Sequence, residues 1–308
     1  MSTVVRESQR GVAVVLAMGL VALAAIAAAA MLASQSTWSR HAELSSEHAQ
    51  AQALVGAGID WARALLADDR RASSVDHLGE AWAQRLPPVP VQNGELAGQI
   101  DDQQGAFNLN NLVRSGAVSP PHLAQFRRLL EILGLPVALA GALADWLDAD
   151  HEPQPQGGAE DGYYQGLQPP YRTAGRPLTD VAELALVRGF DAGVRARLRP
   201  FVTALPRFTA VNVNTASPEV LAAVIEDLDL DAARELAEQR SRAYFRSRAE
   251  FLAQLPAGAA AAANDIATSS DFFLASARVT IGGAQARGSA LLARGPAGWP
   301  AVVWRKYP

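Results

Sequence analysis

Cysteine is absent from this chain of 308 residues. The protein therefore has no disulfide framework and no Cys nucleophile, although an oxidising compartment remains permitted. Several enzyme signatures are missing as well: the HExxH helix, the P-loop, the G-x-S-x-G elbow and the dinucleotide fingerprint. The histidines are dispersed without metal-ligand spacing. We therefore expect a protein that is not an enzyme.

Positive charge is in slight deficit, since the formal net charge is -4. Nucleic-acid binding draws much of its affinity from Lys and Arg, so this balance argues against nucleic acid as the main partner. One basic stretch stands out, and we interpret it as the solvated flank of a helix because carboxylates accompany it. The stretch comprises Arg240, Arg242, Arg246 and Arg248, beside Glu235, Glu238 and Glu250.

Charge of either sign is missing from a long segment that ends before Arg40. Residues 12–33 of this segment are apolar, and roughly 20 such residues at about 1.5 Å each cross the hydrocarbon core of a bilayer. Three interpretations remain open: a secretory signal cut near Ala30, an uncleaved single-pass anchor, or a leader (residues 1–11) cut after Gly11 so that Val12 becomes the N-terminus. Two arginines that precede the span favour a cytoplasmic N-terminus.

The third interpretation resembles type IV pilins and pseudopilins, in which a prepilin peptidase removes a short leader and leaves the hydrophobic helix in place. Arg10-Gly11 before the apolar run carries this resemblance. Most members of that family have Glu as the fifth mature residue, whereas this chain has Leu16. A buried charge is costly unless it is paired, so a subunit without that Glu suits a position with no earlier subunit above it. The departure indicates a filament tip.

Beyond the span, apolar residues recur at spacings of four or seven over residues 41–67, which predicts that the anchor continues as one long helix. These residues are Leu44, Ala51, Val55, Ile59, Ala62 and Leu66. Gly56 and Gly58 lie within the stripe. Each weakens a helix by about 1 kcal/mol relative to Ala, so we expect a bend or a close contact there.

Strand patterns occur on both sides of a helical region, which predicts an α+β fold. Residues 95–107 and 271–308 form the expected antiparallel sheet, with a hairpin at Gly282-Gly283. Pro87, Pro88 and Pro90 indicate an irregular connector. We expect an α+β domain (34–107 and 271–308) interrupted by an inserted α-helical domain (108–270), which contains two helices around a break at 134–136.

Six carboxylates lie among Pro and Gly residues in segment 145–161. Carboxylate oxygens are the hard ligands that calcium prefers. The segment is no EF-hand, because Pro153 stands where that loop requires Gly and Ala159 where it requires Glu. Spacing alone leaves two interpretations, a structural calcium site or a solvated acidic loop ordered by Tyr163, Tyr164 and Tyr171.

Three stretches make the resemblance to a family more specific: the run from DWLDADHEPQPQGG to LALVRGF at 145–190, FNLNNL at 107–112 and VNVNTA at 211–216. Together with the leader and Leu16, they resemble the minor pseudopilin K of type II secretion, the general secretion pathway protein K family, over nearly the whole chain.

That resemblance implies a pseudopilin fold: a long N-terminal transmembrane helix packed on a small antiparallel sheet, interrupted by a large inserted helical domain. It also implies a non-enzymatic subunit of the inner membrane with a periplasmic domain. At the pseudopilus tip, this subunit would cap or initiate the filament with minor pseudopilins I and J, for export of folded proteins across the outer membrane. Family members bind calcium in the acidic segment, and the ligands we expect are Asp148, Asp150, Glu160 and Asp161.

A rival interpretation comes from segment 211–240, which resembles the helix-hairpin-helix modules of DNA-uptake proteins. Those modules place a Gly-rich hairpin where backbone amides meet phosphate. Here Asp227, Asp229 and Asp231 occupy the hairpin, and their carboxylates would repel DNA. We therefore expect the module to serve protein contacts, with Thr215 or Ser217 capping its first helix.

Overall fold

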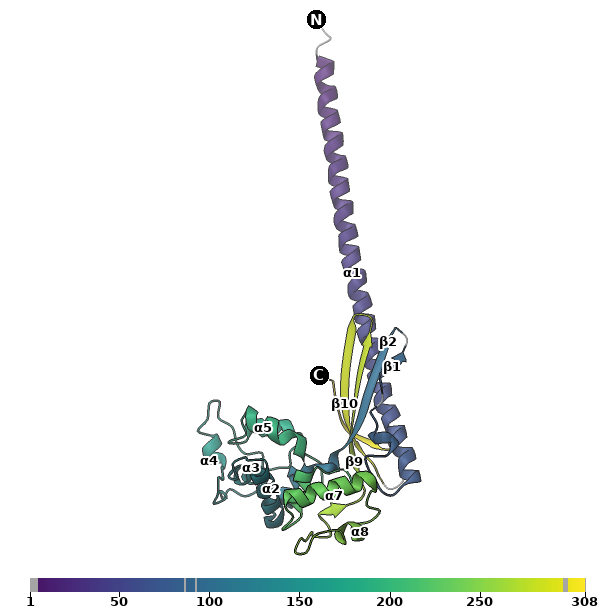
Figure 1. Cartoon of the computed structure of the whole chain (residues 1–308). Coiled ribbons are helices and arrows are strands. Elements are labelled where there is room, and N and C mark those ends of the chain that lie inside the picture. The colour runs from purple at the N-terminus through teal and green to yellow at the C-terminus, as the bar shows by residue number, and fades with distance from the viewer. Residues whose placement is uncertain (1–4, 86, 92, 296–298, 308) are drawn as a thin grey trace.

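The computed structural model describes residues 5–85, 87–91, 93–295 and 299–307. Its longest element is helix α1, Val5–Ala72. The upper part of α1 projects alone, its lower part packs on a sheet, and a helical domain lies at the far end of that sheet (Figure 1). The first four residues of the predicted leader lie outside the described residues. The expected continuous helix from the anchor to residue 67 is confirmed.

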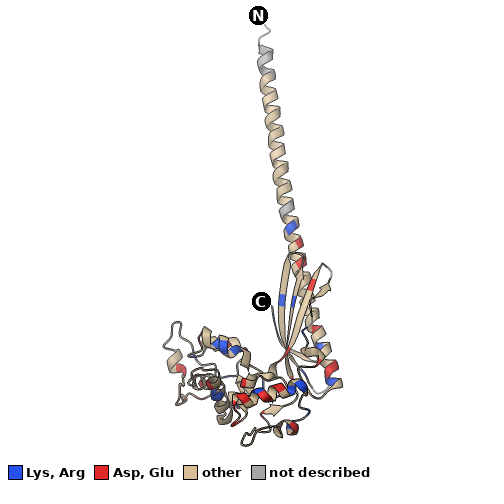
Figure 2. Ribbon diagram, in the orientation of Figure 1, with Lys and Arg blue, Asp and Glu red and all other residues tan. Residues whose placement is uncertain are grey.

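The two parts of α1 differ in burial. Leu44 is 44% exposed, so the buried stripe begins later than predicted, at Ala51, and continues through Val55, Ile59, Ala62 and Leu66. Burying a side chain such as Ile59 or Leu66 contributes about 1.5–3 kcal/mol. Residues 12–39 of the upper part carry no Lys, Arg, Asp or Glu. This part contains a window that is long and apolar enough to cross a membrane, none of that window is buried, and Figure 2 shows an uninterrupted tan stretch along it above the first charged residues.

Gly58 lies at the closest approach of α1 to the sheet. A Cβ atom at this position would lie 3.3 Å from Cβ of Ala277, whereas a Cβ atom at Gly56 would have no neighbour within 4 Å. The close contact expected in this region is therefore found at Gly58. The helix remains continuous through both glycines.

A five-stranded antiparallel sheet covers the lower part of α1, in the order β1-β2-β9-β10-β11. The strands are β1 (Val89–Val91), β2 (Gly94–Asp102), β9 (Phe272–Ile281), β10 (Ala284–Ala293) and β11 (Ala301–Lys306). The predicted hairpin is confirmed, since Ile281 pairs with Ala284 and Gly282 has a φ of 52°. The prediction of an irregular connector over Pro87, Pro88 and Pro90 is wrong at its C-terminal end. Pro90 lies in β1, where an edge strand tolerates its missing N–H.

The inserted region is mainly helical. Its helices are α2 (Pro120–Ile132), α3 (Leu139–Leu147), α4 (Asp161–Tyr164), α5 (Ala192–Leu198), α6 (Pro218–Val224), α7 (Leu230–Arg242) and α8 (Arg248–Leu252). The predicted break between its first two helices is confirmed at Gly134, which has a φ of 60°. Buried side chains of these helices form a core of their own, separate from the core between α1 and the sheet.

Short strands also occur in this region, where the sequence predicted helix alone. Strand β3 (Phe107–Asn108) pairs with β6 (Val202–Thr203), β4 (Val113–Arg114) with β5 (Ala117–Val118), and β7 (Val211–Asn212) with β8 (Ile266–Ala267). Each has two residues, which is too short for a period of two to appear in the sequence. Phe107 stacks on Phe126 at 5.8 Å between ring centroids, so it packs in the helical core and not against the main sheet.

Buried asparagines of the two Asn-containing motifs join distant segments. Asn110 Nδ2 donates to the carbonyls of Leu178 (2.9 Å) and Leu205 (2.8 Å). Asn212 Nδ2 donates to the Asp76 carbonyl (3.1 Å) and to Asp102 Oδ2 (3.0 Å), at the junction between the sheet and the helical domain. These asparagines satisfy buried polar groups, which need hydrogen-bond donors.

Candidate metal centre

Three carboxylates converge inside the helical domain. Asp145, Asp148 and Glu160 are all buried, and each offers one oxygen within 4.8 Å of the others. Helix α3 positions the first two, because Asp145 lies in its last turn and Asp148 caps its end. The intervening loop then returns to place Glu160 immediately before α4.

The three carboxylates differ in their partners. Asp145 accepts hydrogen bonds from the backbone N–H of Gln154 (Oδ1, 3.1 Å) and of Ala159 (Oδ2, 2.7 Å). Both oxygens of Asp148 and both of Glu160 are buried without a hydrogen-bond partner in the described structure. Burying charged oxygens unpaired is costly. The arrangement therefore fits a cation with an all-oxygen ligand set, which is the chemistry of calcium.

Electrostatics support this reading of the cluster. Burial, reinforced by the charge of Asp150, raises the pKa of Asp148 to about 7. Burial and then the charge of Asp145 raise the pKa of Glu160 to about 7. The pKa of Asp145 is also raised by burial, although its two backbone donors oppose that shift. Like charges this close disfavour full ionisation at neutral pH unless a cation compensates them.

Two of the four predicted ligands, Asp148 and Glu160, lie in this cluster. Asp150 is exposed and accepts the Glu152 N–H at 2.8 Å. Asp161 points elsewhere: its carboxylate accepts the N–H (3.0 Å) and Oγ1–H (3.1 Å) of Thr173. The predicted ligand set omits Asp145. The sequence does contain a signal for this residue, because Asp145 lies three residues before Asp148 at the end of a helix, and that spacing places the two side chains on one face.

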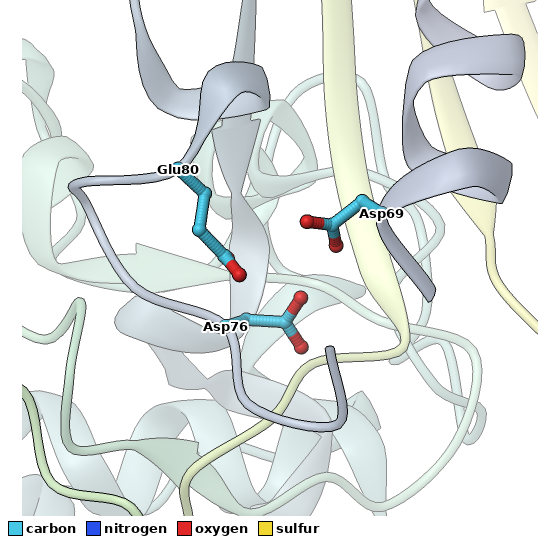
Figure 3. A group of neighbouring side chains, drawn as sticks. All are labelled: Asp69, Asp76 and Glu80. Carbon is cyan, nitrogen blue, oxygen red and sulfur yellow. The ribbon is translucent and has the colours of Figure 1, made fainter. Parts of the chain in front are cut away.

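A second acidic cluster lies where α1 meets the sheet. Asp69, Asp76 and Glu80 point toward one another from the end of α1 and the loop that follows it (Figure 3). Here protein groups compensate the charge. Arg294, buried on β10's C-terminal side, donates to Asp69 (Nη1–Oδ2, 2.8 Å) and to Asp76, while Trp82 Nε1–H donates to Glu80 at 2.7 Å. We assign this cluster a structural role.

The segment that resembles a helix-hairpin-helix module does fold as two helices, α6 and α7. Ser217 caps α6, as predicted, by accepting the Val220 N–H at 3.3 Å. In the hairpin, Asp227 has a φ of 54°, and Asp229 caps α7 through the Ala232 N–H at 2.8 Å. Carboxylates thus stand at the hairpin where a DNA-binding module presents free amides to phosphate.

Family models match the helical domain in two adjoining parts. Both are described as type II secretion system (T2SS), protein K, and they match residues 105–207 and 211–269, more than half of the chain. The chain belongs to the type II secretion system protein K family. The predicted family is therefore confirmed.

Similar proteins agree with this assignment. The type II secretion system protein K of Pseudomonas aeruginosa is 41% identical over 81% of this chain and 78% of its own length. The protein K of Klebsiella pneumoniae is 36% identical over 97% of this chain and 96% of its own length. Among solved structures, the GspK-GspI-GspJ complex of enterotoxigenic Escherichia coli contains a chain with a TM-score of 0.77 and 26% identity, which covers 87% of this chain and 99% of that one.

These similarities confirm the predicted fold class, in which a long apolar helix packs on a small antiparallel sheet and a helical domain is inserted. They also confirm the predicted class of function. Members of the protein K family are minor pseudopilins, structural components of the secretion system.

Proposed function

We propose that this chain caps or initiates the pseudopilus from its tip and that it has no enzymatic activity. The supporting observation is the position of the helical domain, beyond the end of the sheet that lies farthest from the N-terminus of α1 (Figure 1). In a filament whose subunits align their long helices, this bulk would occupy the place of the next subunit. Leu16, which replaces the usual acidic residue, agrees with a subunit that has none above it.

We propose that minor pseudopilins I and J are its partners at the tip. The similar solved chain belongs to a complex described as GspK-GspI-GspJ, and the match covers nearly all of that chain. The uncharged residues 12–39 of α1, with their exposed apolar side chains, suit helix packing in such an assembly.

Before assembly, the chain would lie in the inner membrane as a single-pass protein with a periplasmic domain, and prepilin peptidase would cut between Gly11 and Val12. The apolar window in α1 supports the anchor. Its position directly after Gly11 suits a leader that is removed on the near side of the span. Mass spectrometry of the membrane-extracted protein should then find Val12 at the N-terminus.

We also propose that calcium binds in the helical domain, held by Asp145, Asp148 and Glu160. When bound, the ion would neutralise carboxylates that otherwise repel one another, and it would order the loop between α3 and α4. Unpartnered oxygens on Asp148 and Glu160 support this proposal. We propose a structural role for this ion, because neutralising the buried carboxylates would hold the loop between α3 and α4 in place.

The alternative function, DNA binding or DNA uptake, has weaker support. The family assignment favours secretion, and the hairpin of the α6–α7 module carries carboxylates at the position where phosphate would approach. Absence of an electrophoretic shift of duplex DNA at physiological salt is the expected result.

The tip position can be tested by labelling, because the chain has no native Cys. Ala257 is exposed on the helical domain, so Ala257→Cys provides a unique thiol for maleimide-gold. On sheared pseudopili, electron microscopy should show gold at one end only, and the unsubstituted chain should show none. Gold distributed along the filament length would refute the proposal.

A further inference from the structure

A cleft of about 620 Å³ lies where the helical domain meets the loop after α1, away from the carboxylate cluster. Three arginines line it, Arg114, Arg246 and Arg248, and no Asp or Glu of the described residues does. The rest of its polar lining consists of hydroxyl groups and one amide, from Ser74, Ser247, Asn264, Thr268 and Ser269. This concentration of positive charge is unexpected in a chain whose net charge is -4.

Arg114 is held over the cleft from one side. It is the last residue of β4, and the tight turn that follows, Ser115-Gly116, has positive φ at both positions. The Gly116 carbonyl accepts the Ala149 N–H at 3.0 Å, which ties this hairpin to the end of α3. The guanidinium carbon of Arg114 lies 5.5 Å from the centre of the Phe208 ring, a cation–π contact that orients it along the cleft wall.

The other two arginines come from the start of α8. Ser247 caps this helix by accepting the Glu250 N–H at 3.2 Å, and the Glu250 carboxylate accepts the Arg246 N–H at 2.7 Å. This reciprocal pair of bonds fixes the backbone that carries Arg246 and Arg248. Arg248 also donates to the Ala263 carbonyl.

None of the three guanidinium groups forms an ion pair with the described residues. The acidic side chains nearby are engaged elsewhere. Glu250 is bonded to backbone, and Asp265 turns into the domain, where it accepts from Gln125 Nε2 at 2.6 Å and lies 3.4 Å from His122 Nε2. Within the described part of the protein, no carboxylate therefore forms an ion pair with the guanidinium groups of the cleft, although Glu250 lies beside Arg246.

We propose that this cleft binds an acidic peptide segment of a protein partner. Guanidinium groups pair with carboxylates through charge-assisted and often bidentate hydrogen bonds, and the hydroxyls can complete the contacts. The volume lies within the usual range of ligand sites, roughly 300–1,000 Å³. The inference does not depend on the tip position proposed above, since it concerns only the surface of this chain.

A nucleic acid is the less suitable ligand. Proteins that bind single strands follow the backbone with a continuous positive groove and stack its bases on aromatic side chains. Here the surrounding segment 211–269 contains more carboxylates than guanidinium groups, and such a balance does not suit a polyanion. An acidic side-chain cluster, in contrast, needs only the local arrangement of the three arginines.

The test uses the full chain in a non-ionic detergent and a fluorescein-labelled oligoglutamate peptide, with binding followed by fluorescence anisotropy. Binding should weaken as salt increases. Arg114→Gln combined with Arg246→Gln should weaken it by about tenfold or more, because two charge-assisted contacts are lost. The matched control is Arg172→Gln combined with Arg234→Gln, which removes the same charge from exposed positions outside the cleft and should leave binding unchanged.

A charge-reversed variant guards against a simple loss of folding. Arg114→Glu combined with Arg246→Glu should lose oligoglutamate binding and gain binding of an oligolysine peptide. Equal weakening by the cleft and control variants would overturn the proposal, as would an absence of oligoglutamate binding. Tighter binding of a length-matched oligothymidylate would replace the peptide with a phosphate ligand and also overturn it.

Discussion

One carboxylate oxygen of Asp148 lies within 4.8 Å of one from Glu160, and none of the four oxygens of this pair has a hydrogen-bond partner in the described structure. The second acidic cluster shows the contrast, since Arg294 and backbone donors compensate its carboxylates. The pair between α3 and α4 therefore destabilises the metal-free domain, and a cation would reverse that effect.

Substitution Glu160→Gln should have opposite effects with and without calcium. The amide removes one ligand charge, so the calcium dissociation constant should rise by about tenfold or more. In the chelator-treated protein, the same change removes repulsion from Asp145 and Asp148, so Tm should increase. Isothermal calorimetry and thermal unfolding, each with and without chelator, measure the two effects.

The control for this prediction is Asp161→Asn, which alters a neighbouring acidic residue that bonds to Thr173 outside the cluster. Its calcium affinity should stay near that of the unsubstituted chain. Equal losses of affinity in both variants would restore Asp161 as a ligand and would contradict the geometry described above.

The pH dependence of stability should differ between the two metal states. The pKa of Asp148 is raised from 3.8 to about 7 and that of Glu160 from 4.5 to about 7, so the folded metal-free protein binds more protons than the unfolded chain between these limits. Its free energy of unfolding should consequently fall as pH rises from about 4 to about 7. Calcium needs deprotonated ligands, so the increase in Tm caused by calcium should grow over the same range.

Thermal unfolding at a series of pH values, with calcium and with chelator, measures this difference. Asp69, whose pKa burial also raises to about 7, contributes to both curves and cancels in their difference. A calcium-induced increase in Tm that stays constant from pH 5 to pH 7 would contradict the assignment.

The elements that could be predicted from sequence are those whose burial is periodic. Val55, Ile59 and Leu66 recur on one face of a long helix, and residues of β9 and β10 alternate between core and surface, so both patterns are visible locally. Strands β3 and β7 could not be predicted in this way. They have two residues each, and their partners lie far away in the chain, so only the folded structure brings them together.

The convergence of carboxylates could be predicted from the sequence in part, whereas calcium binding itself stays a prediction. Clustered carboxylates in a Pro- and Gly-rich loop indicated a calcium site, and Asp148 and Glu160 do converge. The path of the loop decides the remaining ligands, because it turns Asp161 toward Thr173 and leaves Asp150 exposed. Nothing in the local spacing specifies that path.

Arg294 should contribute strongly to stability. Its side chain is 2% exposed, it pairs with Asp69 and Asp76, and it lies 4.7 Å from the centre of the Phe273 ring. Arg294→Met would leave buried carboxylates without their counter-charge, which typically costs about 3–5 kcal/mol. Chemical denaturation of the full chain in detergent measures this loss.

The comparison for that variant is Arg305→Met, which breaks an exposed ion pair with Asp60 (3.2 Å). An exposed pair contributes about 0–1 kcal/mol, so this change should be nearly neutral. Losses of similar size in both variants would show that the Asp69–Asp76–Glu80 cluster does not need Arg294.

The contact between α1 and the sheet can be measured with two glycines in the same helix. Gly56→Ala should raise the free energy of unfolding by about 0.5–1 kcal/mol, because Ala favours the helix and its Cβ atom meets no neighbour within 4 Å. Gly58→Ala should gain less, since its Cβ atom would lie 3.3 Å from Cβ of Ala277 and 3.5 Å from Cδ1 of Leu96.

Larger side chains should separate the two positions further. Gly58→Leu should lose about 1–3 kcal/mol through overpacking against β9, whereas Gly56→Leu should remain close to the unsubstituted chain or above it. Both substitutions change helix propensity equally, so the difference between their denaturation midpoints reports the packing of α1 on the sheet alone. Equal midpoints would mean that α1 can move away from Ala277 at little cost, and Gly58 would then not fix the distance between helix and sheet.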